Sequence, residues 1–275
     1  MKDVLVTMVN TNEWEDIKRC LLTLYADTKD CGLDFGVVIV DNASAEDIAP
    51  LLKEFFPDVA LICQERNEGF GASHNVAMKS KDATYYFVLN PDTTIVHGER
   101  LIKKMFDWME AHPKVGILGP KILYPNGDLQ YSCYRFPSFL QPIYSRTKLG
   151  RKGKGKQIAE RFSMKDFDHA KTQPVDWIMG SAMFARKKAI DEVGMFDKRY
   201  WMYAEDCDWC RRMWEGHWAV YYVHDMVISH VHKRASAKVP GVLNALIKNK
   251  YARVHLISWL KYFWKWRKNH VYYQS

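Results

Sequence analysis

Short apolar runs alternate with amphipathic segments through the first third of the chain. The apolar runs are rich in β-branched and aromatic residues and end in polar turns, as buried strands do. In the segments between them, apolar residues recur every three or four positions, which indicates helices with one buried side. The predicted strands are 4–9, 35–40, 59–63 and 85–89, and the predicted helices are 14–25, 48–56 and 72–79. Strands that alternate with helices in this way predict an α/β fold with a mostly parallel sheet.

The pattern is less regular in the rest of the chain. Further strands are predicted at 115–122, 182–185 and 218–223, and a further helix at 204–215. The segment 146–156 is rich in glycine and cations and comes close to a phosphate-binding loop, but Gln157 stands where that loop requires Ser or Thr. We therefore expect a surface loop there, with a lid or a contact to an anionic acceptor as the alternative.

Positive charge is concentrated at the end of the chain. The 275 residues carry a formal net charge of +8, but ten of the 40 Lys and Arg follow Asp225 and none of the 32 acidic residues does. The chain up to Asp225 therefore has 30 basic and 32 acidic residues, a balance of −2. A basic tail on a slightly acidic body predicts contact with an anionic surface and argues against a nucleic-acid-binding protein.

The tail also contains a helical pattern with two sides. The apolar side is Leu256, Trp259, Leu260, Phe263 and Trp266, and the basic side is Lys261, Lys265 and Lys268. Trp and Lys divided in this way suit a helix that lies in a membrane interface. A helix packed on the domain, or on a second copy in a homodimer, is the alternative. No apolar run is long enough to span a membrane and no signal peptide is visible, so we expect a cytoplasmic protein.

The strongest chemical signal follows the predicted strand 85–89. Asn90-Pro91-Asp92 comes directly after this run, and Pro91 stops the strand because it has no N–H to donate. Asp92 is then expected to be an exposed carboxylate at the carboxyl edge of the sheet, where open α/β sheets bind ligands. Carboxylates and phosphates are the usual ligands of Mg²⁺ in nucleotide chemistry, and Mn²⁺ is the alternative. His230 or His232 is a candidate nitrogen ligand.

A second acidic cluster opens the predicted helix 204–215. Glu205 and Asp206 stand in its first turn, where the helix dipole stabilises negative charge. An ionised carboxylate that faces a sugar hydroxyl can act as a general base, and simple capping of the helix is the alternative. Together the two acidic signals favour metal-assisted transfer of a group from a nucleotide-linked donor.

Polar turns at two other strand ends are candidate nucleotide contacts. Asp41 and Asn42 end the predicted strand 35–40 and can hydrogen-bond a base or a ribose, although they can equally cap a helix. Residues 67–71 form a glycine-rich turn that opens a helix, and such turns let a ligand approach the backbone. A strained turn without a ligand is the alternative there.

The motifs follow one another in an order that resembles glycosyltransferase family 2, which has the GT-A fold. The series is Val9-Asn10-Thr11-Asn12, Val40-Asp41-Asn42-Ala43-Ser44, Asn67-x-Gly-Phe-Gly71, Leu89-Asn90-Pro91-Asp92, Trp177-x-x-Gly180-Ser-Ala, Gly194-x-Phe196-Asp197 and Glu205-Asp206-x-Asp208. The resemblance covers about residues 3–236. The Asn-Pro-Asp form, with Asp128-Leu-Gln130-Tyr-Ser132-x-x-Arg135-Phe136-Pro137-Ser138, resembles the bacterial rhamnosyltransferase branch.

The resemblance implies a role for each of these positions. The implied donor contacts are Asn10, Asn12, Asp41, Asn42, Asn67, Gly71, Asn90, Trp177 and Gly180. Arg135 and Trp177 would border the acceptor. Asp92 and His230 would hold Mg²⁺ or Mn²⁺, although His232 remains open as the second ligand. Asp206 would be the catalytic base, with Glu205 beside it.

The resemblance also implies an activity. It would be an inverting transfer of L-rhamnose from dTDP-L-rhamnose to a lipid-linked saccharide, at the inner face of the membrane, in the synthesis of a cell-surface polysaccharide. A hexosyltransferase that uses a UDP-sugar is the alternative within the family, and a catalytically inactive scaffold is another. We expect a transferase domain at 1–238, with a Rossmann-like nucleotide-sugar half at about 1–95 and an acceptor half at about 96–238, and a helical tail at 239–275.

Overall fold

Parallel strands and the helices that connect them make up the first third of the chain. The computed structural model describes residues 1–96, 98–139, 141, 150, 152–231 and 248–268. The elements of this part are β1 (Lys2–Asn10), α1 (Trp14–Thr28), β2 (Phe35–Asp41), α2 (Ala49–Phe55), β3 (Ala60–Cys63), α3 (Phe70–Ser80) and β4 (Ala83–Leu89). β1 pairs in parallel with both β2 and β4, and β2 pairs in parallel with β3. The predicted parallel α/β arrangement is confirmed.

The second half extends the same sheet with strands of mixed direction. Its elements are β5 (Thr93–Ile95), α4 (Leu101–Ala111), β6 (Val115–Leu123), β7 (Leu129–Gln130), β8 (Cys133–Tyr134), β9 (Gln173–Pro174), β10 (Trp177–Ile178), β11 (Ala182–Arg186), α7 (Lys187–Val193), α8 (Glu205–Glu215) and β12 (Ala219–His230). The strand order is β3-β2-β1-β4-β11-β6-β12-β5, and β8 and β10 form a small separate sheet. β12 continues beyond the predicted end at 223, because a register shift between Val223 and Val227 takes up the polar residues between them.

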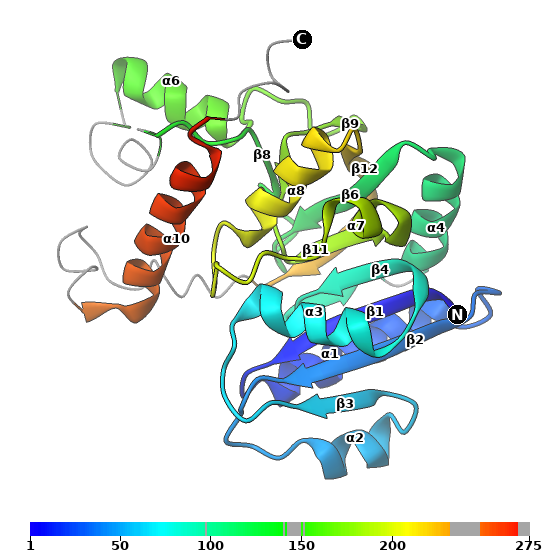
Figure 1. The fold of residues 1–275 in the computed structure, drawn as a ribbon. Coiled ribbons are helices and arrows are strands. Elements are labelled where there is room, and N and C mark those ends of the chain that lie inside the picture. The colour runs from blue at the N-terminus through cyan, green and yellow to red at the C-terminus, as the bar shows by residue number, and fades with distance from the viewer. Residues whose placement is uncertain (97, 140, 142–149, 151, 232–247, 269–275) are drawn as a thin grey trace.

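Apolar side chains cover both faces of the sheet. Along β4, Tyr85, Phe87 and Leu89 point into one core and Tyr86 and Val88 into the other, as the two-residue period of a strand requires. The first core is covered by α1 and α4, and the second by α3, α7 and α8 (Figure 1). Burial on both faces explains why the central strands read as continuous apolar runs in the sequence.

The tail helix, α10 (Lys250–Trp266), lies beside α8 (Figure 1). It buries Tyr262 and Trp266 with Tyr200, Ala204 and Cys207, and Trp259 and Phe263 pack at the edge of that cluster. Three members of the apolar side defined from the sequence therefore face the protein. Among the described residues, no helix is both long and apolar enough to cross a membrane. The parts of the predicted tail at 239–247 and 269–275 lie outside the described residues.

A helix also replaces part of the surface loop expected at 146–156. α6 (Gly153–Phe162) begins inside that segment, so the expectation of a loop was wrong from Gly153 onward. Half-buried Ile158 and Phe162 give this helix an inner side, and Lys156 and Glu160 pair one turn apart at 3.7 Å. Residues 146–149 and 151 lie outside the described residues.

Candidate active site

A cavity of about 560 Å³ lies where strands of both halves end. β1, β2, β4 and β12 end at this edge, and β11 begins there, with the Asn90 amide donating to the Ser181 carbonyl at 2.9 Å. Eight of the residues proposed from the sequence line the cavity: Asn42, Asn67, Asn90, Asp92, Gly180, Glu205, Asp206 and His230. Motifs separated by up to 188 positions, from 42 to 230, therefore share one site.

Other proposed donor residues shape the wall from behind. Asn10 is fully buried, donates through Nδ2 to the Asp41 carboxylate and accepts through Oδ1 from the Glu13 amide at 2.9 Å. Asn12 accepts through Oδ1 from the Ala45 amide at 2.8 Å. These bonds tie the turn after β2 to the end of β1, so Asn10, Asn12 and Asp41 hold the shape of this wall of the cavity.

Asn42 joins the two turns that form this side of the cavity. Its Oδ1 accepts from the Glu68 amide at 2.9 Å, and its Nδ2 donates to Asn67 Oδ1 at 3.1 Å. Asn67 Oδ1 in turn accepts from the Gly69 amide at 3.0 Å. These hydrogen bonds orient both asparagines within the wall of the cavity.

The glycines of the turn allow close packing. Gly69 has φ +89°, and a Cβ there would lie 2.0 Å from the Trp201 carbonyl oxygen. Phe70 N donates to that same oxygen at 2.9 Å. A Cβ on Gly71 would lie 2.8 Å from Phe196 Cβ, so Gly71 seats α3 on the core and does not line the cavity. Gly69 thus makes the contact between the donor side and the loop before α8.

Asp92 and His230 face each other in the cavity wall. Asp92 Oδ1 lies 3.1 Å from His230 Nε2, and the two residues are only 7% and 4% exposed. The expectation that Asp92 is exposed was therefore wrong. Thr93 pairs with His230 across β5 and β12, and the Val231 amide donates to the Asp92 carbonyl at 3.1 Å. This pairing covers the carboxylate with a strand that comes from the far end of the domain.

Gln130 sets the tautomer of His230. Gln130 Nε2 donates to the His230 carbonyl at 3.3 Å, so its Oε1 is the atom that lies 2.6 Å from His230 Nδ1. Nδ1 then carries a proton, and Nε2 is the ring nitrogen that lies 3.1 Å from Asp92 Oδ1. A nitrogen and a carboxylate oxygen this close to each other could both bind one metal ion. His232, the other candidate, lies outside the described residues.

Asp92 and His230 suit a divalent cation that also binds oxygen atoms of a ligand. No third His, Cys, Asp or Glu joins Asp92 and His230 within the part of the chain that the structure describes. Mg²⁺ commonly binds through one or two protein groups, with phosphate oxygens and water completing its shell. Two protein ligands at the rim of a cavity of this size suit that arrangement.

Glu205 and Asp206 lie at the start of α8 on the opposite wall. Asp206 accepts hydrogen bonds from the Gly180 amide at 2.9 Å and from the Cys207 amide at 2.8 Å. Burial raises the pKa of Asp206 to about 6, although these amides act in the opposite direction. Burial and the charges of Asp206 and Asp208 raise the pKa of Glu205 well above its ordinary value. Glu205 Oε2 is buried and has no hydrogen-bond partner among the described residues.

The backbone before α8 is strained. Tyr203 and Ala204 have φ of +68° and +66°, the left-handed region that residues with a Cβ rarely occupy. Consecutive residues in this region cost about 1–3 kcal/mol each and persist where the surroundings enforce them. This strained turn directs Glu205 and Asp206, the first residues of α8, toward the cavity.

Aromatic side chains from the loop before α8 and from α10 complete the opposite wall of the cavity. Trp201, Tyr203 and Tyr251 line the cavity, and Tyr251 comes from α10. Trp201 and Tyr251 stack with ring centres 6.4 Å apart. None of these three residues was predicted from the sequence, because no motif marks them and α10 joins the loop before α8 only in the folded protein.

Trp177 and Arg135 lie outside the cavity lining. Trp177 Nε1 donates to the Arg135 carbonyl at 3.0 Å, and its ring stacks on Tyr134 with ring centres 4.6 Å apart. These contacts hold β8 and β10 together. Trp177 is thus connected to the active site through Gly180, three residues later, whose amide donates to Asp206.

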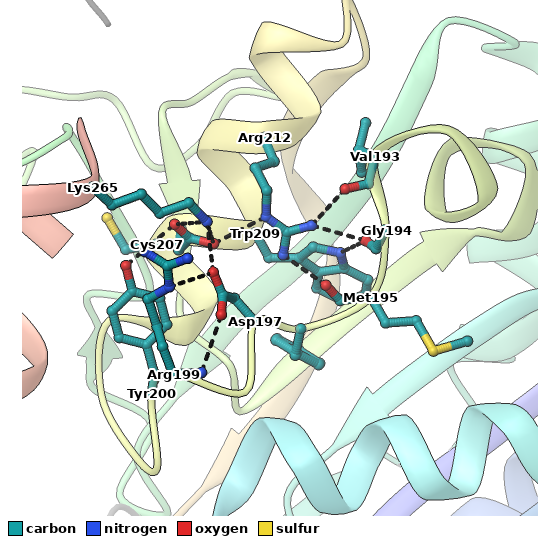
Figure 2. A network of polar contacts seen from close by, with 12 residues as sticks. Val193, Gly194, Met195, Asp197, Arg199, Tyr200, Cys207, Trp209, Arg212 and Lys265 are labelled. Carbon is teal, nitrogen blue, oxygen red and sulfur yellow. Dashed lines mark hydrogen bonds and ion pairs between the residues drawn. The ribbon is translucent and has the colours of Figure 1, made fainter. Parts of the chain in front are cut away.

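A buried ionic network fastens α8 to α10 (Figure 2). Asp208 is fully buried, and its carboxylate accepts from Arg212 Nε at 2.9 Å, Lys265 Nζ at 2.8 Å and Trp266 Nε1 at 2.9 Å. Lys265 also pairs with Asp197 at 2.8 Å. Burial opposes ionisation of Asp197, but Lys265 and Arg199 outweigh it and lower its pKa to about 2. The helix that begins with Glu205 and Asp206 is therefore held in place by the tail.

Sequence relatives are named rhamnosyltransferases. The N-acetylglucosaminyl-diphospho-decaprenol L-rhamnosyltransferase of Mycobacterium tuberculosis is 27% identical over 261 residues, which cover 88% of this chain and 80% of that protein. The dTDP-rhamnosyl transferase RfbF of Shigella flexneri is 25% identical over 238 residues, which cover 86% of this chain and 72% of that protein.

Solved structures share the fold at lower identity. GalNAc-T7 with UDP, GalNAc and Mn²⁺ superposes with a TM-score of 0.61 at 13% identity, over 84% of this chain and 43% of that one, so this chain spans less than half of its length. TarS 1–349 of S. aureus gives 0.53 at 16% identity, over 97% of this chain and 73% of that one. The expected GT-A fold is confirmed.

The family model for glycosyl transferase family 2 matches residues 5–194, more than half of the chain. That span includes the nucleotide side of the cavity and Asp92, and ends just before the loop that leads to α8. The chain belongs to glycosyltransferase family 2 and is a glycosyltransferase similar to rhamnosyltransferases.

Proposed function

We propose that the protein transfers L-rhamnose from dTDP-L-rhamnose to a hydroxyl of a lipid-linked saccharide, with inversion at the anomeric carbon. The observation that carries the proposal is the convergence of the Asp92–His230 pair and the Glu205–Asp206 pair on one cavity. The names of the relatives support the donor and the acceptor, because one is a dTDP-rhamnosyl transferase and the other acts on a diphospho-decaprenol-linked sugar. A UDP-sugar donor is the alternative within the family.

The nucleotide would bind on the side formed by Asn42 and Asn67. Their fixed amides offer donors and acceptors at the carboxyl edge of the parallel strands, the place where open α/β sheets bind nucleotides. Asp92 and His230 would hold Mg²⁺ or Mn²⁺ against the diphosphate of the donor. When bound, the metal neutralises the charge that grows on the leaving nucleoside diphosphate. This division assigns residues of about 1–95 mainly to the donor and the later residues mainly to the acceptor.

Asp206 would remove the proton from the acceptor hydroxyl. The oxygen then forms a bond to the anomeric carbon from the face opposite the nucleotide, and the bond to the diphosphate breaks. The amides of Gly180 and Cys207 orient the Asp206 carboxylate for this step. Burial and the charges of Asp206 and Asp208 raise the pKa of Glu205, which favours its protonated form and so limits the negative charge beside the base.

The outer side of α10 would rest on the membrane. Exposed apolar residues form a stripe along it, with basic residues beside them: the apolar set is Leu256, Ile257, Leu260 and Trp264, and the basic set is Arg253, Lys261, Arg267 and Lys268. Trp264 is 68% exposed although it is the largest apolar side chain of the stripe. This stripe replaces the apolar side defined from the sequence, since Trp259, Phe263 and Trp266 pack inward. An apolar helix face with a basic rim suits an anionic bilayer.

Donor turnover tests the proposal directly. Purified protein with Mn²⁺ or Mg²⁺ would be offered dTDP-rhamnose, UDP-glucose, UDP-galactose, UDP-N-acetylglucosamine and GDP-mannose, with and without lipid-linked N-acetylglucosamine. We expect metal-dependent release of dTDP from dTDP-rhamnose, and faster release with the acceptor. Release from a UDP-sugar alone would reject rhamnose as the donated sugar and keep the transferase. Removal of residues 250–275 would test the membrane contact, since vesicle binding should fall.

A further inference from the structure

A second cavity, of about 690 Å³, lies at the far end of α10. It is bounded by α6, by the end of α10, by α8 and by residues 135–139 and 141. Tyr251 of α10 lines the active site and Trp266 lines this second cavity, and fifteen helical residues separate them, a distance of about 22 Å along the axis. The second cavity is therefore separate from the place where the donor would bind.

Arginine is the dominant charged residue in the wall of this cavity. Arg135, Arg161, Arg211 and Arg267 line it, and Asp176 is the one carboxylate among its described lining residues. Asp176 already accepts a hydrogen bond from the Phe136 amide at 2.6 Å. The lining alone thus carries three formal positive charges more than negative ones, in a cavity with low-dielectric aromatic walls that strengthen the field.

Three of the arginines are weakly neutralised. Arg135 lies 3.8 Å from Asp166, near the limit of an ion pair. Neither Arg161 nor Arg267 has a carboxylate within ion-pair distance among the described residues. The Nε of Arg135 is buried without a hydrogen-bond acceptor in that same part of the chain. Buried donors without acceptors are costly, so an incoming oxyanion would be stabilised here.

Apolar surface connects this cavity to the outside of α10. Phe263 and Trp266 line the cavity, and Arg267 lies one residue further on. Phe139 is 63% exposed at its mouth and packs edge-on against Phe263, with ring centres 5.3 Å apart. The exposed stripe of α10 ends beside it at Trp264, whose ring stacks under the Arg267 guanidinium at 4.0 Å. Guanidinium groups next to exposed aromatic rings match a phosphate joined to a hydrocarbon chain.

We propose that this cavity binds the phosphate group of a phosphorylated lipid, with the acyl or prenyl chain over Phe139 and the stripe of α10. The arginines supply forked N–H donors to the phosphate oxygens, and the aromatic residues cover the first part of the chain. The proposal rests on the membrane contact proposed above and adds a specific headgroup to it. It does not require that the bound lipid be the acceptor itself.

Vesicle binding by a double variant tests the proposal. Arg161→Gln with Arg267→Gln removes the two arginines that lack carboxylate partners. Lys53→Gln with Lys188→Gln removes the same charge from exposed positions on α2 and α7 and is the matched control. Binding would be measured to vesicles of phosphatidic acid and to vesicles of phosphatidylserine at equal surface charge. We expect the arginine variant to bind phosphatidic acid about tenfold more weakly than the control, with a smaller change for phosphatidylserine.

A soluble probe separates the two sources of phosphate. Titration with inorganic pyrophosphate should show binding much weaker than that of the lipid. Pyrophosphate binding that depends on the arginines, without any change in vesicle binding, would mean a soluble ligand and would overturn the lipid assignment. Equal behaviour of the two double variants in every assay would overturn the site altogether. Hydrolysis of dTDP-rhamnose without acceptor should stay unchanged in both, so a failure here is distinguishable from a failure of the proposed activity.

Discussion

The two walls of the active-site cavity are built in different ways. The wall that we propose for the donor, here the donor wall, consists of turns that follow adjacent parallel strands, so the sheet places Asn42 and Asn67 side by side. The wall that we propose for the acceptor, here the acceptor wall, is assembled from Trp201, Tyr203 and Tyr251, and it depends on a strained turn and on a helix from the end of the chain. The donor wall is therefore set by the core of the fold, whereas the acceptor wall depends on the docking of α10.

Replacing the proposed base should have the largest effect on turnover. The change should affect the reaction of the acceptor and leave donor binding largely intact. Asp206→Asn keeps the shape of the side chain but cannot take a proton, so kcat should fall by about 10² to 10⁴. Donor affinity, measured by calorimetry with dTDP-rhamnose, should stay within a few fold. Asp191→Asn, an exposed change on α7, is the control. Near-full turnover of Asp206→Asn would remove it from the mechanism.

Replacing Gln130, which contacts His230 on the side away from Asp92, should weaken metal binding on the donor side. Gln130→Leu removes the acceptor of the His230 Nδ1 proton, so the ring loses both its tautomer and its orientation. Outer partners of this kind typically contribute 10- to 100-fold to metal affinity, and the Mn²⁺ concentration for half-maximal activity should rise accordingly. Gln173→Leu on β9, which also pairs with β12, should leave it unchanged. An unchanged metal requirement in Gln130→Leu would argue against His230 as a ligand.

The pH dependence of kcat/KM should report the ionisation of Asp206, the proposed base. Asp206 works only when ionised, and burial raises its pKa to about 6. The value of kcat/KM for the acceptor should therefore fall about tenfold for each pH unit below about 6 and level off above it. The residual activity of Asp206→Asn should lack this limb. A wild-type profile that stays flat down to about pH 4 would place the base elsewhere.

Weakening the attachment of α10 should have the smallest effect on turnover. It should affect the acceptor wall and leave the donor wall nearly unchanged. Lys265→Met leaves Asp197 and Asp208 without their shared ammonium, and the free energy of unfolding should fall by about 2–3 kcal/mol in urea. KM for the acceptor should rise several fold, with donor hydrolysis nearly unchanged. Lys261→Met, whose exposed ammonium contacts only a backbone carbonyl, should stay within about 0.5 kcal/mol.

The stability difference between the wild type and Lys265→Met should depend on pH in the acid range. The pKa of Asp197 is lowered to about 2 in the folded protein, from about 3.9 when unfolded. Its pairing with Lys265 therefore stabilises the protein above about pH 4 and ceases to do so as the pH falls toward 2. The difference between the wild type and Lys265→Met should shrink over that window. A constant difference would mean that Lys265 acts through packing alone.

Local pattern was enough to predict the donor half, because its elements are sequential neighbours. The two-sided burial of β4 appears directly as the run 85–89, and its end at Leu89, two residues before Pro91, follows from proline chemistry. The burial of Asp92 could not be foreseen, since it depends on β5 pairing with β12 across more than 130 residues. The inner side of α10 could not be foreseen either. Periodicity shows that a helix has an apolar side, but α10 has two such sides, and only the contacts with α8 distinguish them.

The contact at Gly69 makes the binding of the two substrates interdependent. The Asn67–Phe70 turn on the donor side touches the Trp201 carbonyl with no spare room, and Trp201 Nε1 donates back to the Asn67 carbonyl at 3.1 Å. A nucleotide that fixes this turn also fixes Trp201, and so lowers the entropy that the acceptor must lose on binding. Thermodynamic reciprocity then requires the acceptor to tighten the donor by the same factor. A ternary complex would then form cooperatively, because Asn67 and Trp201, which line the two walls of the cavity, contact each other.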